Sequence, residues 1–194
     1  MRVYNKENFI VFNTIQMYRH DRLPYFYKLI EMAKENNFNI GIKIVRGAYM
    51  EKERERAEKM GYPSPIHVSK QKTDEDYNKA IQLSVENIDC VSVCVATHNE
   101  QSILHLTQLM ARASLANNHP RIYAAQLFGM SDNISYNLSD SGYNVVKYVP
   151  YGKVRTVIPY LMRRAAENTS VAGQTSRELK LIKEELERRK KEER

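Results

Sequence analysis

The stretch Ile40-Gly41-Ile42-Lys43-Ile44-Val45 has the length and the β-branched content of a short, buried strand. Arg46-Gly47-Ala48-Tyr49 follows it directly, so polar chemistry begins where the apolar run ends. Four comparable runs lie at residues 9–16, 91–96, 122–127 and 145–149. Amphipathic stretches separate all five runs. This alternation of strands with helices predicts an α/β fold with a parallel sheet and right-handed crossovers.

The helical stretches show apolar residues at helical spacing. They lie at residues 25–33, 80–88, 103–113, 131–138 and 154–167. Ser131-Asp132 has the composition of a helix N-cap, and Thr175-Ser176-Arg177-Glu178 resembles a capping box. Gly173 stands before that box as a C-cap or hinge. We therefore divide the chain into a body, residues 1–174, and a charged C-terminal helix, residues 175–194.

Composition excludes several classes of protein. The chain has 194 residues, enough for one domain with a real core. No window of about 18 apolar residues occurs, so no membrane-spanning helix is expected. The residues after Met1 lack the apolar core of a secretory signal, and two cysteines are too few for a disulfide framework. We expect a reducing compartment.

The net charge of +7 raises the question of a nucleic-acid partner. The segment 176–194 holds eight basic and six acidic side chains, so it contributes little of the excess. The remaining charge is spread along the body, and no basic stripe is interleaved with aromatic residues. We expect no nucleic-acid partner.

Polar side chains capable of binding or catalysis follow each predicted strand. Because the carboxyl ends of parallel strands meet at one edge, that edge is where ligands bind in α/β folds. These side chains are Gln16, Lys43, Arg46, Thr97, His98, Asn99, Gln126, Lys147 and Tyr148.

Two groups among these side chains have ordinary alternatives. Lys43 and Arg46 can hold a phosphate or stabilise negative charge, but they can equally be solvated cations around a turn. The segment Thr97-His98-Asn99 can line a site or can simply cap the following helix. His98 has no second ligand at metal-binding spacing, and Cys90 and Cys94 read as core residues, so no metal site is expected.

Arg163, Arg164 and Glu167 form the sharpest local pattern. On a helix, Glu167 lies four residues after Arg163 and three after Arg164, so it can pair with either. Arginine also suits bidentate recognition of a carboxylate. A surface ion pair is the more frequent use of such a pattern.

Five short motifs occur in a fixed order along the chain, and they identify it more specifically than the order of strands and helices does. Together they resemble the proline dehydrogenase family over most of the chain. The motifs are K-I-V-R-G-A-Y (43–49), A-T-H-N (96–99), Q-L-F-G-M (126–130), K-Y-V-P-Y-G (147–152) and P-Y-L-M-R-R-A-A-E-N (159–168).

The resemblance implies a distorted (β/α)8 barrel with FAD at the carboxyl ends of its strands, and it assigns roles residue by residue. Lys43 matches the family's basic residue beside flavin N5, where it stabilises the reduced flavin. Arg163 and Arg164 match the pair that clamps the proline carboxylate, with Glu167 as their ion-pair partner. Tyr148 and Leu127 match residues that pack on the substrate ring, and the Tyr favours proline over hydroxyproline by crowding the ring. The further FAD contacts implied are Gln16, Arg46, Gly47, Ala48, Thr97 and His98.

The activity implied is oxidation of L-proline to Δ1-pyrroline-5-carboxylate, with hydride passing to FAD and electrons then to a quinone. A quinone acceptor implies peripheral contact with a membrane. The expected location is the cytoplasm at the inner face of a membrane, or the matrix side in a mitochondrion.

The chain departs from the family in length. A (β/α)8 barrel has eight strands in about 250 residues, whereas five strands are predicted here. The fold expected is therefore the last five βα units of the barrel plus the charged helix. One alternative function is an inactive, incomplete portion of the enzyme that needs its N-terminal half. A basic binding module is a third, distant alternative.

Overall fold

The computed structural model describes the backbone of residues 1–170 and 174–192, with side chains described for 1–164, 179–180 and 182–191. Strands and helices alternate along the chain. The elements are β1 (Phe12–Gln16), α1 (Arg22–Glu35), β2 (Ile40–Val45), α2 (Met50–Met60), α3 (Lys70–Glu86), β3 (Val91–Ala96), α4 (Glu100–Arg112), β4 (Ile122–Leu127), α5 (Asp132–Asp140), β5 (Val145–Tyr148), α6 (Val154–Ser170) and α7 (Gln174–Glu192).

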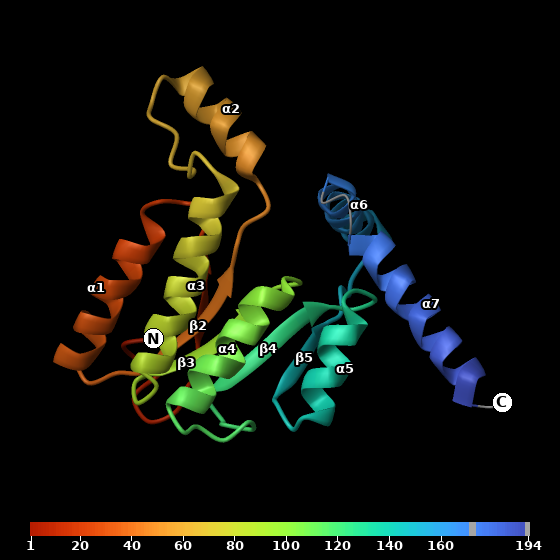
Figure 1. Ribbon diagram of the computed structural model, residues 1–194. Coiled ribbons are helices and arrows are strands. Elements are labelled where there is room, and N and C mark those ends of the chain that lie inside the picture. Colours follow the sequence, from red (N-terminus) through yellow and green to blue (C-terminus); the bar gives the residue numbers. More distant parts are fainter. Residues whose placement is uncertain (171–173, 193–194) are drawn as a thin grey trace.

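The five strands form one parallel sheet in the order β1-β2-β3-β4-β5, which confirms the predicted fold class. Each strand lies beside its predecessor, as in one wall of a (β/α) barrel. The register places Lys43 of β2 opposite Thr14 of β1 and Cys94 of β3. Figure 1 shows α1, α3, α4 and α5 together on one side of this sheet.

The core lies between that side of the sheet and those four helices. Ile42 and Ile44 of β2, and Val93 and Val95 of β3, are fully buried there. Side chains alternate between the two faces of a strand, so Lys43 lies on the opposite face from these residues. Packing the β-branched side chains against helices therefore leaves Lys43 on the face that carries the cavity described below.

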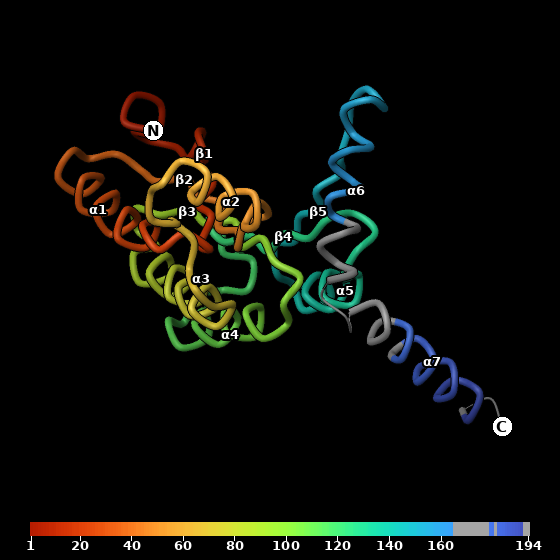
Figure 2. Tube along the Cα trace, turned by 90° about the horizontal axis from the view of Figure 1, so that it is seen from above, coloured from red at the N-terminus to blue at the C-terminus, as the bar shows by residue number. Residues whose placement is uncertain are grey.

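The opposite face and the two sheet edges are more open. Phe12 of β1 and Val146 of β5 are each 42% exposed. Among the described strands, β1 pairs only with β2 and β5 only with β4. Seen from above in Figure 2, α6 stands beside β5 and α7 extends away from the body. A row of unpaired backbone groups at each edge is a template for further strand pairing.

The predicted boundaries agree closely with the sheet. β2, β3 and β4 have the expected bounds, whereas β1 begins three residues later than expected and β5 ends one residue earlier. Ile88 was expected on a helix, but α3 ends at Glu86. The predicted hinge at Gly173 lies outside the described residues, as do the side chains of the predicted capping box at 175–178.

Ser131 occupies the predicted N-cap position of α5, but it does not cap the helix with its side chain. Ser131 precedes α5 but has a left-handed backbone, with φ of 50°, and its side chain makes no capping hydrogen bond. Its hydroxyl is instead 2.9 Å from Nδ1 of His98. A tertiary contact has therefore replaced the local cap at this position.

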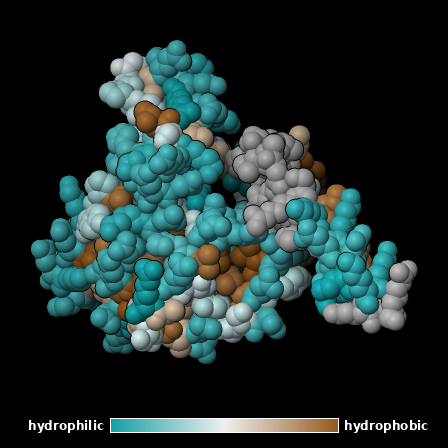
Figure 3. Space-filling view, in the orientation of Figure 1, coloured by the Kyte–Doolittle hydropathy of each residue, from teal (hydrophilic) through white to brown (hydrophobic). Residues whose placement is uncertain are grey.

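The outer surface in the view of Figure 3 is mostly hydrophilic over α1, α3 and α4, as expected for helices that cover a core. None of the helices that the structure describes is both long and apolar enough to cross a bilayer.

Candidate functional site

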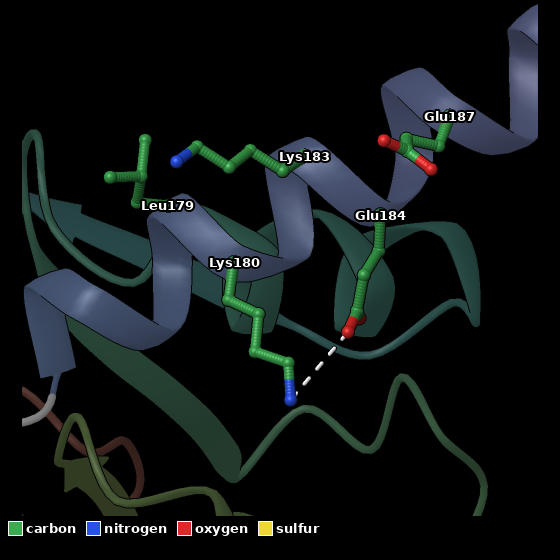
Figure 4. A pocket seen from close by; sticks show the side chains of 5 residues that line it. All are labelled: Leu179, Lys180, Lys183, Glu184 and Glu187. Carbon is green, nitrogen blue, oxygen red and sulfur yellow. Dashed lines mark ion pairs between the residues drawn. The ribbon is translucent and has the colours of Figure 1, made fainter.

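A cavity of about 760 Å³ lies at the carboxyl edge of the sheet. All five strands or the loops that follow them contribute to its wall, and α6 closes it with Tyr160 and Arg164. Parallel strands place their carboxyl ends at one edge, so residues from distant motifs converge there. A smaller hollow of about 340 Å³ lies along α7 (Figure 4), but five side chains of that one helix line it and none of the predicted site residues does.

Ten of the twelve predicted site residues line the larger cavity. Arg163 is not among its lining residues, and the side chain of Glu167 lies outside the described part of the chain. The ten are Gln16, Lys43, Arg46, Gly47, Ala48, Thr97, His98, Leu127, Tyr148 and Arg164. The structure thus brings the predicted cofactor contacts to one place together with half of the arginine pair.

Two cations and two aromatic rings form a row across this cavity. The ammonium of Lys43 lies 5.1 Å from the ring centre of Tyr148, and the guanidinium carbon of Arg164 lies 5.5 Å from that of Tyr160. The two rings meet edge to face, with centroids 6.1 Å apart. Each cation is therefore attracted to a ring, and the contact between the two rings connects the two cation–ring pairs.

Tyr160 is a lining residue of the cavity to which the sequence analysis gave no role. It lies four residues before Arg164, so both share one face of α6. That spacing was available in the sequence, but Tyr160 carries no charge and follows no strand. Its partner Tyr148 comes from β5, so only the fold shows that the two rings meet.

Arg46 is held by the protein itself. Its Nε donates to Asp74 at 2.6 Å, its Nη1 to Thr97 at 2.8 Å and its Nη2 to Ser102 at 2.9 Å. Its guanidinium carbon lies 4.2 Å from the ring centre of Tyr77. Burial alone would raise the pKa of Asp74, but hydrogen bonds from Lys70 and Arg46 outweigh it and hold that pKa below its usual value.

The A-T-H-N motif both caps a helix and lines the cavity. Asn99 is the N-cap of α4, where its side chain accepts from the backbone N–H of Ser102 at 2.9 Å. The hydroxyl of Thr97 accepts from the backbone N–H of Asn99 at 3.0 Å. The capping alternative is confirmed for Asn99, while Thr97, His98 and Asn99 all remain in the cavity wall.

His98 is a neutral group at this edge. Burial, and then the positive charge of Lys147, lower its pKa below the ordinary value of 6.5. Lys147 itself does not line the cavity and pairs with Asp132 at 2.7 Å. His98 therefore brings a ring nitrogen but no positive charge to the cavity near pH 7.

Gly47 is required by packing within the protein. Its φ is +120°, and a Cβ at this position would overlap the ring of Tyr18. Tyr18 is only 4% exposed, and burial raises the pKa of its phenol. The turn after β2 therefore depends on glycine whether or not a ligand approaches it.

The cavity suits a flavin better than a metal ion. No group of three or more His, Cys, Asp or Glu side chains is placed to hold a metal within the part of the chain that is described. The cavity offers a fixed cation at Lys43, aromatic and aliphatic walls, and the polar side chains of Gln16 and Thr97. Arg163 of α6 does not line the cavity, but its Nε atom is buried and has no hydrogen-bond partner among the described residues. A planar heterocycle that gains negative charge fits such a lining.

The family model for proline dehydrogenase matches residues 1–177. The chain is 38% identical to proline dehydrogenase 1, mitochondrial, of Drosophila melanogaster, and 39% identical to the protein of that name from Homo sapiens. Each match covers 97% of this chain but only 29% and 32% of those relatives. A hydroxyproline dehydrogenase of Xenopus laevis is 37% identical over 92% of this chain and 39% of its own length.

Solved structures of proline utilization A (PutA) share the fold. The PutA of Bdellovibrio bacteriovorus, inactivated by N-propargylglycine, aligns with a TM-score of 0.78 and 27% identity. That alignment covers 84% of this chain and 17% of the PutA chain. The chain spans about a third of the length of the first two relatives described above. With its motifs, its parallel sheet and the cavity at the sheet's carboxyl edge, this chain belongs to the proline dehydrogenase family.

Proposed function

We propose that this chain provides the cofactor- and substrate-binding edge of an FAD-dependent enzyme that oxidises L-proline to Δ1-pyrroline-5-carboxylate. The observation that carries the proposal is the row of Lys43, Tyr148, Tyr160 and Arg164 across one cavity. Such a row offers a cation for a carboxylate at one end, an apolar surface in the middle and a second cation at the other end.

The Arg164 end suits the substrate. Proline has a carboxylate and a compact apolar ring. The guanidinium of Arg164 supplies a fixed charge for the carboxylate, and the rings of Tyr148 and Tyr160 supply apolar surface for the ring. Leu127 adds to that surface from β4. Arg163 and Glu167 join this proposal as the second arginine and its acidic partner.

The Lys43 end suits the cofactor. Bound FAD supplies the two-electron acceptor for the oxidation. Lys43 stabilises negative charge there, while His98 is neutral and Arg46 and Lys70 share the single carboxylate of Asp74. Gln16 and Thr97 provide polar contacts in the wall, and the backbone of Gly47 and Ala48 forms the turn beside them.

The proposal extends to the electron acceptor and the location. A quinone would accept the electrons, which requires peripheral contact with the membrane that holds the quinone. The enzyme would then act at the inner face of that membrane, in the cytoplasm of a bacterium or on the matrix side in a mitochondrion. The mitochondrial names of the fly and human relatives support the second location.

The open sheet edges support a requirement for further strands. The backbone of β1 and of β5 is unpaired on its outer side within the described residues, and Phe12 and Val146 are each 42% exposed. We propose that preceding strand–helix units, the N-terminal half of the barrel, pair with these edges. The alternative is that the chain is an incomplete portion of the enzyme and is inactive without that half. In that case the chain alone would bind FAD, but proline would not reduce the bound flavin.

The test is the visible spectrum of the chain after incubation with FAD, alone and mixed with the N-terminal half of a family member. We expect bound flavin that L-proline bleaches, with weaker bleaching by hydroxyproline. Arg164→Met should raise the proline concentration needed for half-bleaching by more than tenfold, since a buried charge-assisted hydrogen bond to the carboxylate is lost. Arg112→Met is the matched control, because Arg112 is exposed on α4 and away from the cavity.

Two outcomes would contradict the proposal. One is a chain that binds FAD, alone or complemented, and is never bleached by proline. The other is a bleaching reaction in which Arg164→Met and Arg112→Met behave alike, because the row across the cavity would then have no part in binding the substrate.

A further inference from the structure

Arg46 lines the cavity, yet its guanidinium faces three protein acceptors. Asp74 of α3 accepts a hydrogen bond from Nε, Thr97 accepts one from Nη1 and Ser102 of α4 accepts one from Nη2, all at 2.6–2.9 Å. The ring of Tyr77 lies 4.2 Å from the guanidinium carbon. Each nitrogen of the guanidinium therefore has a protein partner, and its charge is paired with the carboxylate of Asp74, which it shares with Lys70. Arg46 therefore differs from a solvated cation, which would have no protein acceptors and could bind a phosphate directly.

The partners of Arg46 lie at both ends of one turn in the cavity wall. Thr97 opens the turn between β3 and α4, and Ser102 stands in the first turn of α4. The hydroxyl of Thr97 also accepts from Asn99, and the side chain of Asn99 accepts from the backbone of Ser102. The hydroxyl of Ser102 donates a hydrogen bond to the side-chain oxygen of Asn78 of α3 at 2.8 Å. Arg46 therefore ties the turn at both ends and links it to α3.

The turn in question supplies a continuous part of the cavity wall. Residues Ala96 to Gln101 all line the cavity. Thr97 is 7% exposed and Ser102 is 1% exposed, so both hydroxyls are screened from water. Hydrogen bonds to a charged donor are strongest in such surroundings, and a buried acceptor that loses its donor is costly.

We propose that Arg46 is a positioning residue for the cofactor. It sets the shape of the turn at residues 97–102, and this turn, rather than the guanidinium, contacts FAD. The proposal rests on FAD as the ligand of this cavity. In this proposal the effect of Arg46 on FAD affinity depends on its hydrogen bond to Thr97. If Arg46 instead contacted FAD directly, its effect on the affinity would not depend on Thr97.

The substitution Arg46→Lys separates the two cases. Lysine keeps the positive charge and its reach, so a direct electrostatic contact with a phosphate would largely survive. Lysine cannot donate to Asp74, Thr97 and Ser102 from one rigid plane, so the clamp on the turn would be lost. We expect Arg46→Lys to weaken FAD binding by about 10- to 100-fold.

A double-mutant cycle tests the route through Thr97. Thr97→Val keeps the side-chain shape but removes the acceptor, and we expect FAD binding to weaken by about tenfold. The double variant Arg46→Lys/Thr97→Val should bind FAD within about threefold of Arg46→Lys alone, because both changes break the same contact. Additive losses would overturn the proposal and favour a direct contact between Arg46 and the cofactor.

The measurement is titration of the full chain with FAD, followed by quenching of flavin fluorescence, with the visible circular dichroism of the bound flavin as a second readout. The two single variants should change that dichroism in the same way. Matched controls are Arg112→Lys and Thr107→Val on α4, which lie outside the cavity wall. Neither control should change FAD affinity by more than about twofold.

The outcomes distinguish failure of this proposal from failure of the function. If the unaltered chain does not bind FAD, with or without the N-terminal half, the proposed function fails. If it binds FAD and Thr97→Val leaves the affinity within twofold, the positioning role fails. That second variant keeps the test decisive even where Arg46→Lys does not fold.

Discussion

Replacing Tyr148 with leucine should weaken substrate binding while leaving the fold intact. Tyr148 stands in the middle of the row across the cavity, with the Lys43 ammonium 5.1 Å from its ring centre and the Tyr160 ring 6.1 Å away. It lies on a sheet edge and is 47% exposed, so it contributes little to the core. Leucine keeps an apolar side chain at this position but removes both ring contacts.

The magnitude follows from those two contacts. An edge-to-face aromatic pair contributes about 0.5–1.5 kcal/mol beyond area burial. A cation over an exposed ring contributes about 0.5–1 kcal/mol. Without these contacts the substrate must order the side chains that they held in place, so their joint value of about 1–2.5 kcal/mol is the upper limit of the loss in binding, a rise of at most about 5- to 60-fold in the proline concentration for half-bleaching of bound flavin. Tyr148→Phe keeps the ring and should stay within about twofold of the unaltered chain.

The assay is proline titration of the FAD-loaded chain, complemented with the N-terminal half where this is needed for bleaching. Urea unfolding of the same variants shows whether the fold is unchanged. A Tyr148→Leu variant that keeps its stability and also keeps its proline affinity within twofold would refute the reasoning. The row of rings and cations would then be a packing feature and not a binding surface.

Three further predictions concern stability, all measured by urea unfolding. Gly47→Ala should lower the free energy of unfolding by at least about 1–3 kcal/mol, from backbone strain and overlap with a buried ring, whereas Gly61→Ala, at φ of +71° with open space around it, should cost about 1 kcal/mol. Ile42→Ala should cost about 2–5 kcal/mol, because this side chain is fully buried between the sheet and its helices. His98 has a lowered pKa in the folded chain, so its contribution is present above the ordinary pKa of 6.5 and is lost as the pH falls through the folded pKa. Between pH 7.5 and 5.5 the unaltered chain should therefore lose more stability than His98→Gln.

Much of the fold follows from local sequence. The bounds of β2, β3 and β4 are those expected, because each run is short, β-branched and bounded by turn residues. The edge strands β1 and β5 were overestimated by three residues and one residue. Edge strands have a neighbour on one side only, so pairing limits them more than composition does.

Much of the site was also predictable. Parallel strands bring their carboxyl ends to one edge whatever their separation in sequence, and nine of the ten predicted residues that line the cavity are there for that reason, the tenth being Arg164 of α6. Tyr160 could not be recognised, since its meaning depends on a contact with Tyr148 from another element. Ser131 has the predicted N-cap position but no capping hydrogen bond, because its hydroxyl lies 2.9 Å from His98, thirty-three residues away, and local composition cannot show such a contact.

The sequence by itself determined the alternation of strands and helices, the pairing of the strands in a parallel sheet and the edge of the sheet at which polar groups lie. These features depend on periodicity and chain direction, which are local. The tertiary structure alone decided which polar groups face a ligand and which face the protein. Arg46 shows the difference, since its three acceptors lie 28, 51 and 56 residues away, and the packing of α3 and α4 against the sheet brings them to one guanidinium.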